Sequence, residues 1–213
     1  MFHGPPLASP NVASPVGPIF PRSRSWAPQG RGTAKSVGRV ALLSVHTSPL
    51  APLGGKKTGG MNVYVRELAL ELIRQGVQVD VFTRANSPRE LSTRHSLGPG
   101  SHLIYVQAGP VAPISIDDIA QHVDEFAAGV MAYAHTFGRC YDVIHSHYWL
   151  SGLVAEALRW AWPAAPVVHM FHTLGHMKNR IAQDESQRAS QVRLDGELGV
   201  VQGADRLIAA TPA

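Results

Sequence analysis

The 213-residue sequence has a single cysteine, Cys140, so no intramolecular disulfide can form. Such low cysteine usage excludes a disulfide-stapled scaffold and fits a reducing compartment. The sequence also lacks a run of eighteen apolar residues, because Glu156 and Arg159 interrupt the most apolar stretch. No transmembrane segment is therefore predicted. The N-terminus has no apolar signal-peptide core, and we expect a cytoplasmic protein.

Acidic residues are missing from positions 1–38, which carry four basic residues and seven prolines. This composition buries too little apolar surface to fold, so we predict a disordered tail over 1–38. The tail also explains the net charge of +4, because 39–213 contains 15 basic and 15 acidic residues. A folded part that is neutral overall has no general basic field, and no nucleic-acid partner is expected.

From residue 39 onward, apolar runs alternate with amphipathic stretches. The runs are typical of strands buried on both faces; they cover 40–46, 77–83, 102–108, 141–147, 166–172 and 206–211. Helices are predicted over 61–75, after a capping box at Ser115 and Asp118, over 150–160 and over 186–202. The helix after Ser115 is expected to bury Ile119, Val123, Phe126, Val130 and Met131. This alternation predicts an α/β fold with a doubly wound, Rossmann-like parallel sheet.

Polar segments follow three of the predicted strands: 46–48, 145–149 and 172–173. In a doubly wound sheet, ligands bind outside the carboxyl ends of the strands. Because parallel strands present these ends at one edge, we expect the three segments to meet there. The sequence thus predicts one polar rim.

The glycines of the stretch HTSPLAPLGGKKTGGMNVYV, residues 46–65, lie between a predicted strand and a predicted helix. Gly55 to Gly60 has the Walker A spacing, but Met61 and Asn62 replace the required Lys and Ser/Thr, and no G-x-G-x-x-G register fits. Gly59 and Gly60 would still let a diphosphate approach the unpaired N–H groups at a helix start. The alternative is a tight glycine turn that binds nothing.

Three other chemistries are disfavoured because the sequence lacks residues that they need. His145 and His147 would point to one side of a strand, as metal ligands can. No Cys or acidic cluster completes a four-ligand set, so no metal site is expected and His145 is interpreted as a hydrogen-bonded rim residue. Ser151 lacks the flanking glycines of a hydrolase nucleophile elbow. The missing dinucleotide fingerprint likewise disfavours a nucleotide-dependent oxidoreductase.

Basic residues follow the 172–173 rim segment. Lys178, Arg180 and Arg193 could bind an anionic substrate, or they could lie on an ordinary solvated helix surface. Trp160 and Trp162 are interpreted as packing residues.

Seven motifs in this order carry a resemblance to a known family; they are HTSPLAP, GGMNVYV, FTRA, AGP, YDVIHSHYWLSG, HTL with Lys178-Asn179, and Arg193-x-x-x-Glu197 before ADRLIAAT. Over roughly 39–211 the chain resembles the N-terminal domain of glycosyltransferase family 4. Within that family it is most similar to the D-inositol-3-phosphate glycosyltransferases, with the sucrose-phosphate synthases nearby.

The resemblance implies one half of a GT-B fold, with residues 39–213 as the acceptor-side domain. The donor-binding domain would be absent from this chain, which would then be inactive alone. The implied reaction is a retaining, metal-independent transfer of a sugar, without a cofactor. The donor would be a nucleotide sugar, expected to be a UDP-sugar, and the acceptor a small polyol, sugar or sugar phosphate. The alternative is a non-catalytic module that binds a sugar phosphate or docks a partner.

The same resemblance assigns roles to residues. Gly59 and Gly60 would contact the donor diphosphate, and His172 would be the catalytic residue beside the transferred sugar. The implied acceptor contacts are Asn62, Tyr148, Thr173 and Arg193. His147, Lys178 and Glu197 are implied to line the cleft.

One position departs from the inositol-phosphate branch. There a lysine that binds the acceptor phosphate follows a Gly-Pro pair by six residues, whereas this chain has Ile116 six residues after Pro110. The resemblance therefore implies the class of reaction without implying inositol phosphate as the acceptor.

Overall fold

The computed structural model describes residues 36–51 and 59–209. Its elements are, in chain order, β1 (Arg39–Leu43), α1 (Gly60–Arg74), β2 (Gln78–Arg84), α2 (Pro88–Leu91), β3 (Arg94–Gly98), β4 (Ser101–Val106), α3 (Ile116–Ala120), α4 (Val123–Thr136), β5 (Val143–His147), α5 (Tyr148–Leu158), β6 (Val167–Met170), α6 (Gly175–Ile181), a short 3-10 helix (Glu185–Gln187), α7 (Gln191–Gly203) and β7 (Arg206–Ile208). The predicted tail, except for 36–38, lies outside the described residues, as do Gly55 and positions 210–211 of the last predicted strand.

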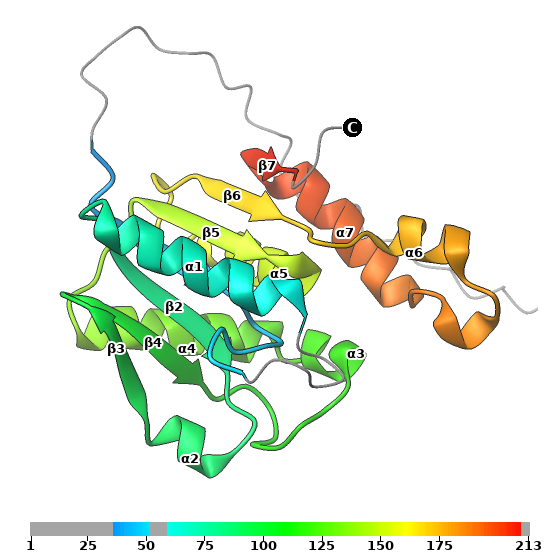
Figure 1. Cartoon of the computed structure of the whole chain (residues 1–213), viewed down its shortest axis with the longest axis horizontal. Coiled ribbons are helices and arrows are strands. Elements are labelled where there is room, and N and C mark those ends of the chain that lie inside the picture. Colours follow the sequence, from blue (N-terminus) through cyan, green and yellow to red (C-terminus); the bar gives the residue numbers. More distant parts are fainter. Residues whose placement is uncertain (1–35, 52–58, 210–213) are drawn as a thin grey trace, which may run out of the picture. The chain divides into compact units, whose positions relative to one another are not determined.

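The strands of the described chain form one sheet in the order β3-β4-β2-β1-β5-β6-β7 (Figure 1). Neighbouring strands are parallel, except that β3 pairs antiparallel with β4. The chain runs outward from β1 through β2 to β4, then returns to the other side of β1 as β5 and continues to β6 and β7. Strand order thus reverses between β1 and β5, where such sheets bind ligands. The predicted doubly wound parallel sheet is confirmed.

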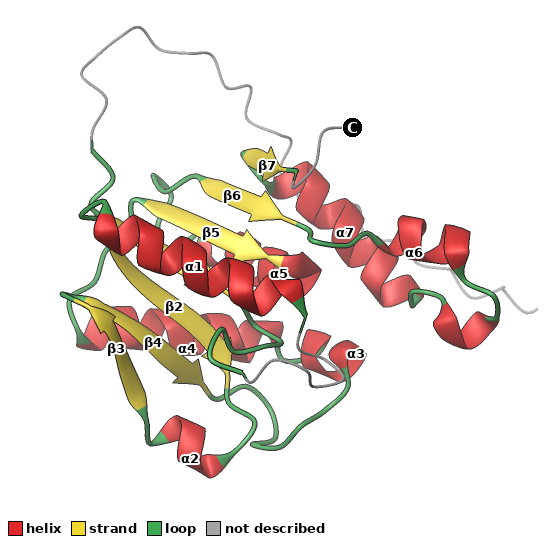
Figure 2. Ribbon diagram, viewed as in Figure 1, coloured by secondary structure: helices red, strands yellow, loops and turns green. Residues whose placement is uncertain are grey.

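Each face of the sheet has its own apolar core, because side chains alternate along a strand. In β1, Val40 and Leu42 pack with Val65 and Ala69 of α1. Ala41 belongs instead to the larger core under α4 and α5. The ribbon shows the same two layers, with α1 on one face and α4 and α5 on the other (Figure 2). The near-continuous apolar strands of the sequence are explained by this burial on both faces.

Several predictions about single elements are wrong. The helix expected after Ser115 is two helices, because the chain leaves the helical conformation at His122 between α3 and α4. Met131, expected to be buried, is 37% exposed. Trp160 is 86% exposed, since α5 ends at Leu158 and the ring follows in a turn. Trp162 does pack, with its ring centroid 4.9 Å from that of Tyr141.

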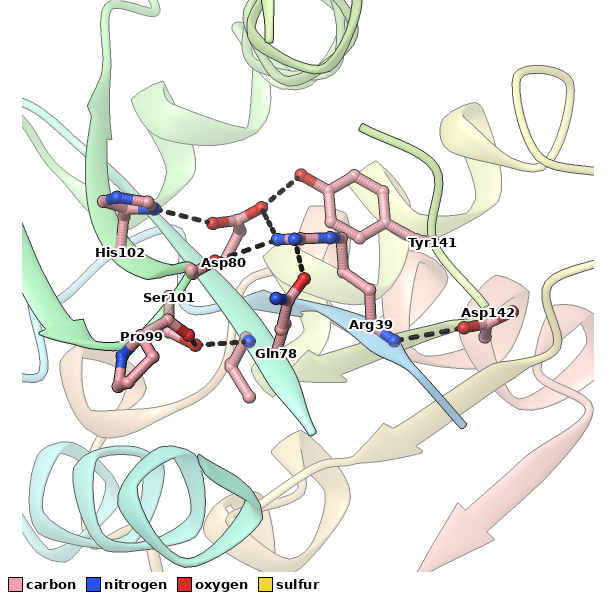
Figure 3. Close-up of polar contacts among 10 residues, drawn as sticks. Arg39, Gln78, Asp80, Pro99, Ser101, His102, Tyr141 and Asp142 are labelled. Atoms are coloured by element: carbon pink, nitrogen blue, oxygen red, sulfur yellow. Dashed lines mark hydrogen bonds and ion pairs between the residues drawn. The ribbon is translucent and has the colours of Figure 1, made fainter. Parts of the chain in front are cut away.

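The amino end of the sheet is closed by a buried polar network around Asp80 (Figure 3). One carboxylate oxygen of Asp80 accepts hydrogen bonds from Arg39 Nη1 at 3.0 Å and from the Tyr141 hydroxyl at 3.1 Å. The other lies 3.3 Å from His102 Nδ1. Arg39 also donates to the Gly100 carbonyl. We call these residues the amino-end network; it links β1, β2, β4 and the segment before β5.

Candidate functional site

The carboxyl ends of β1, β5 and β6 surround a pocket of about 400 Å³, as the polar segments predicted. We call it the rim pocket; it is lined by His46, Thr47, Gly59, Gly60, Met61, Asn62, Tyr148, His172 and Thr173. A second pocket of about 660 Å³, the α7 pocket, has Lys178, Arg188 and Arg193 among its lining residues, and Tyr148 lines both. Residues from distant parts of the sequence therefore meet at the point where strand order reverses.

The start of α1 forms one wall of the rim pocket. Gly59 caps the helix without a side-chain hydrogen bond, and the first turn holds no acidic residue. Both Gly59 and Gly60 are exposed, and a Cβ added at either would meet no heavy atom within 4 Å. The unpaired N–H groups and the positive end of the helix dipole are thus accessible to an anion.

Asn62, in the first turn of α1, is 1% exposed yet lines the rim pocket. Its Oδ1 accepts a hydrogen bond from Thr47 Oγ1 at 2.9 Å. Its Nδ2 has no hydrogen-bond partner among the described residues. Burying an amide donor without a partner is costly, so this group is suited to a ligand that accepts the bond.

Two rim-pocket residues have a backbone conformation that non-glycine residues rarely adopt. Tyr148 has φ of 70° and His172 has φ of 63°; within the described chain no other non-glycine residue has positive φ. A residue with a Cβ is strained in this left-handed region, and such strain concentrates at functional sites. The backbone thus singles out two residues to which the family resemblance independently gave roles.

Histidines from β5 and from the segment after β6 cluster beside the rim pocket. His147 is fully buried, and its Nδ1 lies 3.0 Å from His172 Nε2. The ring of His145 lies 4.4 Å from that of His147. Burial lowers the pKa of His172, and burial together with the neighbouring histidines lowers the pKa of His147 well below its usual range. The cluster is therefore neutral near pH 7.

The interpretation of His145 as a hydrogen-bonded rim residue is wrong. Its side chain is on the same side of β5 as His147, as the i, i+2 spacing requires, but it is 7% exposed and its Nε2 has no partner among the described residues. Burial, with a smaller contribution from His172, lowers the pKa of His145 to about 4. No group of three or more His, Cys, Asp or Glu residues in the described ranges could hold a metal ion.

Arg193 of α7 lines the α7 pocket, contacts Thr173 of the rim pocket and is 7% exposed. Its Nε donates to Glu197 Oε1 at 2.7 Å, and its Nη2 donates to the carbonyl and hydroxyl oxygens of Thr173 at 3.0 and 3.2 Å. Its guanidinium carbon lies 5.0 Å from the centroid of the Tyr148 ring. Glu197 also accepts from the backbone N–H of Gly175 at the start of α6. Arg193 is thus rigidly held against Thr173 and Tyr148.

The remaining predicted residues divide between surface and interior. Lys178 is exposed and lines the α7 pocket, as does Ile116. His147 and Glu197 line neither pocket; they are buried behind His172 and Arg193. Ser151, disfavoured as a nucleophile, is fully buried and accepts a hydrogen bond from the backbone N–H of Val45.

Sequence reasoning missed the contribution of Tyr64. Its ring lies 5.7 Å from that of His147 and 5.3 Å from that of His172, both in edge-on geometry. Tyr64 follows Gly60 by four residues, which places both on one side of α1. That spacing could have identified it.

Comparison with known proteins shows the family and the fold of the chain. Residues 58–213 match the sequence profile of Glycosyltransferase Family 4. The chain is 44% identical over 181 residues to the D-inositol 3-phosphate glycosyltransferase of Kineococcus radiotolerans, a match that covers 84% of this chain and 41% of that protein. The corresponding protein of Mycolicibacterium smegmatis is 46% identical over 174 residues, covering 81% and 40%.

A solved structure of sucrose-phosphate synthase from Thermosynechococcus elongatus superposes with a TM-score of 0.74 at 34% identity, covering 82% of this chain and 43% of that one. The fold is accordingly one Rossmann-like half of a GT-B fold. The chain spans about two fifths of the length of the curated relatives it matches. No described helix is long and apolar enough to cross a membrane. Since the family profile matches well over half of its residues, the chain belongs to glycosyltransferase family 4.

Proposed function

We propose that residues 39–213 form the acceptor-side domain of a retaining, metal-independent glycosyltransferase. The donor is a nucleotide sugar, most simply a UDP-sugar, and the acceptor is a small sugar, polyol or sugar phosphate. Apart from the diphosphate contacts described below, we assign the nucleotide contacts to residues outside 39–213, so we expect residues 39–213 alone to support no turnover. The observation that carries the proposal is the position of Tyr148 and His172, whose left-handed backbones meet in one pocket at the switch point of the sheet.

The donor diphosphate is assigned to the start of α1. Gly59 and Gly60 leave the space in front of the helix N–H groups open, and no acidic side chain in the first turn opposes an anion. When the glycosidic bond breaks, negative charge develops on the diphosphate leaving group. Fixed N–H donors and the helix dipole stabilise that charge without reorganising.

The acceptor is assigned to the junction of the rim pocket and the α7 pocket. Arg193 supplies a positive charge there, and Tyr148 and Thr173 supply hydroxyl groups. Two of the three guanidinium nitrogens already bond to Glu197 and Thr173, so Nη1 is the nitrogen left for an acceptor phosphate. Lys178 and Arg188 add further cations to the α7 pocket, and Asn62 offers its amide to the rim pocket.

His172 is assigned to the reacting sugar. Its ring lines the rim pocket beside Gly59 and Gly60. Burial lowers its pKa, so a neutral imidazole faces the sugar near pH 7. A neutral ring hydrogen-bonds a sugar hydroxyl without adding a positive charge beside the electron-poor anomeric carbon of the transition state.

The acceptor assignment is tested by comparing Arg193→Ala with Arg188→Ala. Both arginines line the α7 pocket, but Arg188 is exposed and pairs with Glu185, whereas Arg193 is buried between the pockets. A charge-assisted hydrogen bond contributes about 1.5–3 kcal/mol. Arg193→Ala should therefore weaken binding of a sugar phosphate by roughly tenfold or more.

Binding is measured by NMR titration of the purified chain with inositol phosphate, a hexose phosphate and the two dephosphorylated compounds. Arg188→Ala should change each affinity by less than about twofold, as an exposed ion pair contributes little. Ile116→Lys, which adds a cation to the same pocket, should improve phosphate-ester binding. An unchanged preference for phosphorylated over plain sugar in Arg193→Ala would show that the acceptor carries no phosphate at this site.

A further inference from the structure

The contact between His147 and His172 contains one hydrogen bond between two imidazoles. The Nδ1 of His147 and the Nε2 of His172 are 3.0 Å apart. Burial lowers the pKa of both rings, so each carries one proton near pH 7. A neutral imidazole has one N–H donor and one bare acceptor nitrogen. One ring must therefore donate and the other accept, and the direction fixes the tautomer of His172.

The burial of His147 decides this direction. Its second nitrogen, Nε2, is inaccessible and has no hydrogen-bond partner among the described residues. If His172 donated through its Nε2–H, His147 would accept through Nδ1 and carry its own proton on Nε2, as a buried N–H without an acceptor. If His147 donates through its Nδ1–H instead, the Nε2 of His147 carries a buried lone pair. Orphaned buried N–H groups are rarer in proteins than undersatisfied acceptors, which favours the second arrangement.

Both rings are held in place by packing. The edge-on contacts of Tyr64 with His147 and His172, and the ring of His145 against His147, restrict rotation of the pair. The strained backbone of His172 fixes where its side chain starts. His147 is also the residue before Tyr148, at the junction of β5 and α5. It therefore ties the position of one strained residue to that of the other.

We infer that His147 is a positioning residue: it donates through Nδ1–H to Nε2 of His172 and so holds His172 as the Nδ1–H tautomer. The ring of His172 then offers the rim pocket an N–H donor rather than an acceptor. This step rests on the proposed assignment of the rim pocket to a sugar. The N–H of His172 then requires a sugar oxygen that accepts a hydrogen bond. His147 itself lines neither pocket, so it acts only through His172.

The tautomer is measured directly by long-range ¹H–¹⁵N NMR on the chain with ¹⁵N-labelled histidine, with His172→Asn used to assign the signals. No substrate is needed, so the result does not depend on the proposed function. We expect His147 and His172 both to carry their proton on Nδ1. A proton on Nε2 of His172 in the wild-type chain would overturn the inference.

Two variants separate positioning from packing. In His147→Asn the side-chain amide keeps an N–H donor near the position of Nδ1, so the His172 tautomer should be retained. In His147→Leu the donor is lost, and the tautomer ratio of His172 should change by roughly fivefold, the equivalent of one hydrogen bond. The His169 signal, from the other face of the sheet, reports that each variant is folded. An unchanged ratio in a folded Leu variant would contradict the inference; if that variant does not fold, the wild-type and Asn spectra decide.

Discussion

The Asp80 carboxylate at the amino end of the sheet and the rim-pocket side chains at its carboxyl end differ in how far their hydrogen-bonding groups are satisfied. At the amino end, the carboxylate of Asp80 is surrounded by donors from Arg39, Tyr141 and His102 (Figure 3). At the carboxyl end, Asn62 and His147 each have a buried nitrogen without a partner among the described residues.

The backbone differs in the same way. Among the described residues, the two that have both a side chain and positive φ, Tyr148 and His172, lie at the carboxyl end. A satisfied network contributes to stability, whereas unsatisfied donors and strained backbone cost stability and persist where a ligand can compensate. The network around Asp80 is therefore suited to stabilising the fold, and the carboxyl end is suited to binding.

The largest effect is expected from Asp80→Ala at the amino end. Removing the carboxylate leaves the Arg39 guanidinium, whose side chain is 11% exposed, without its anion. Breaking a buried ion pair on one side costs about 3–5 kcal/mol. Urea unfolding should show this loss, while Glu67→Ala, which breaks an exposed pair with Arg66, should cost less than about 1 kcal/mol. Equal losses in the two variants would mean that the amino-end network stabilises the fold no more than an exposed ion pair does.

Acid should destabilise the carboxyl end through its histidines. Burial lowers the pKa of His145 to about 4 and that of His169 to about 3, below the value near 6.5 in an unfolded chain. Below pH 6.5 the unfolded state therefore binds more protons than the folded state, so acid favours unfolding. Above pH 6.5 both states are deprotonated at these histidines, and the free energy of unfolding is unaffected by them. It should fall by about 1.4 kcal/mol per pH unit for each such histidine as the pH drops toward its folded pKa.

Urea unfolding between pH 7.5 and 5 measures this slope. His145→Asn should reduce it by about one proton, whereas His135→Asn, at an exposed position of α4, should leave it unchanged. A stability that stays constant between pH 7 and 5 would show that these histidines charge without penalty.

The backbone strain at His172 is tested by a glycine–alanine pair. Both variants remove the imidazole, but only glycine adopts φ of 63° without steric cost. His172→Gly should therefore be more stable than His172→Ala by about 1 kcal/mol. At Glu67, inside α1, the order should reverse by a similar amount, because glycine is the poorer helix residue. The same order at both positions would argue against strain at the site.

Much of the fold could be predicted from the sequence because apolar periodicity reports burial directly. The buried runs gave the strands, and parallel topology then brought residues 46–48, 145–149 and 172–173 to one edge. The i, i+4 spacing of Arg193 and Glu197 likewise anticipates their contact on a helix. What fails is local: Trp160 is apolar but follows the helix end, and the antiparallel strand β3 is polar and half-exposed, so neither carries a periodic signal.

The geometry of the site could be predicted less well from the sequence. The His147–His172 bond joins residues 25 positions apart, and no spacing rule predicts it. The left-handed backbones of Tyr148 and His172 are imposed by tertiary packing, because neither residue type prefers that conformation. The roles given to Gly59, Gly60, Lys178 and the acceptor residues stay predictions until binding is measured.

The smallest effect on stability, and the clearest separation of the two ends, is expected from Gly60→Ala. Gly60 begins α1, and a Cβ there would meet nothing within 4 Å, as is also true of Gly199 in α7. Both Gly→Ala variants should raise the free energy of unfolding by at most about 1 kcal/mol, since alanine favours a helix and restricts the unfolded chain.

The ligand binding of the two variants should differ, because the added methyl group at position 60 occupies the space through which a diphosphate reaches the helix N–H groups. NMR titration with inorganic pyrophosphate should show roughly tenfold weaker binding in Gly60→Ala, equal to the loss of about 1.4 kcal/mol, and no change in Gly199→Ala. Equal pyrophosphate affinity in the two variants would remove the start of α1 from the donor site and leave Gly59 and Gly60 as a plain turn.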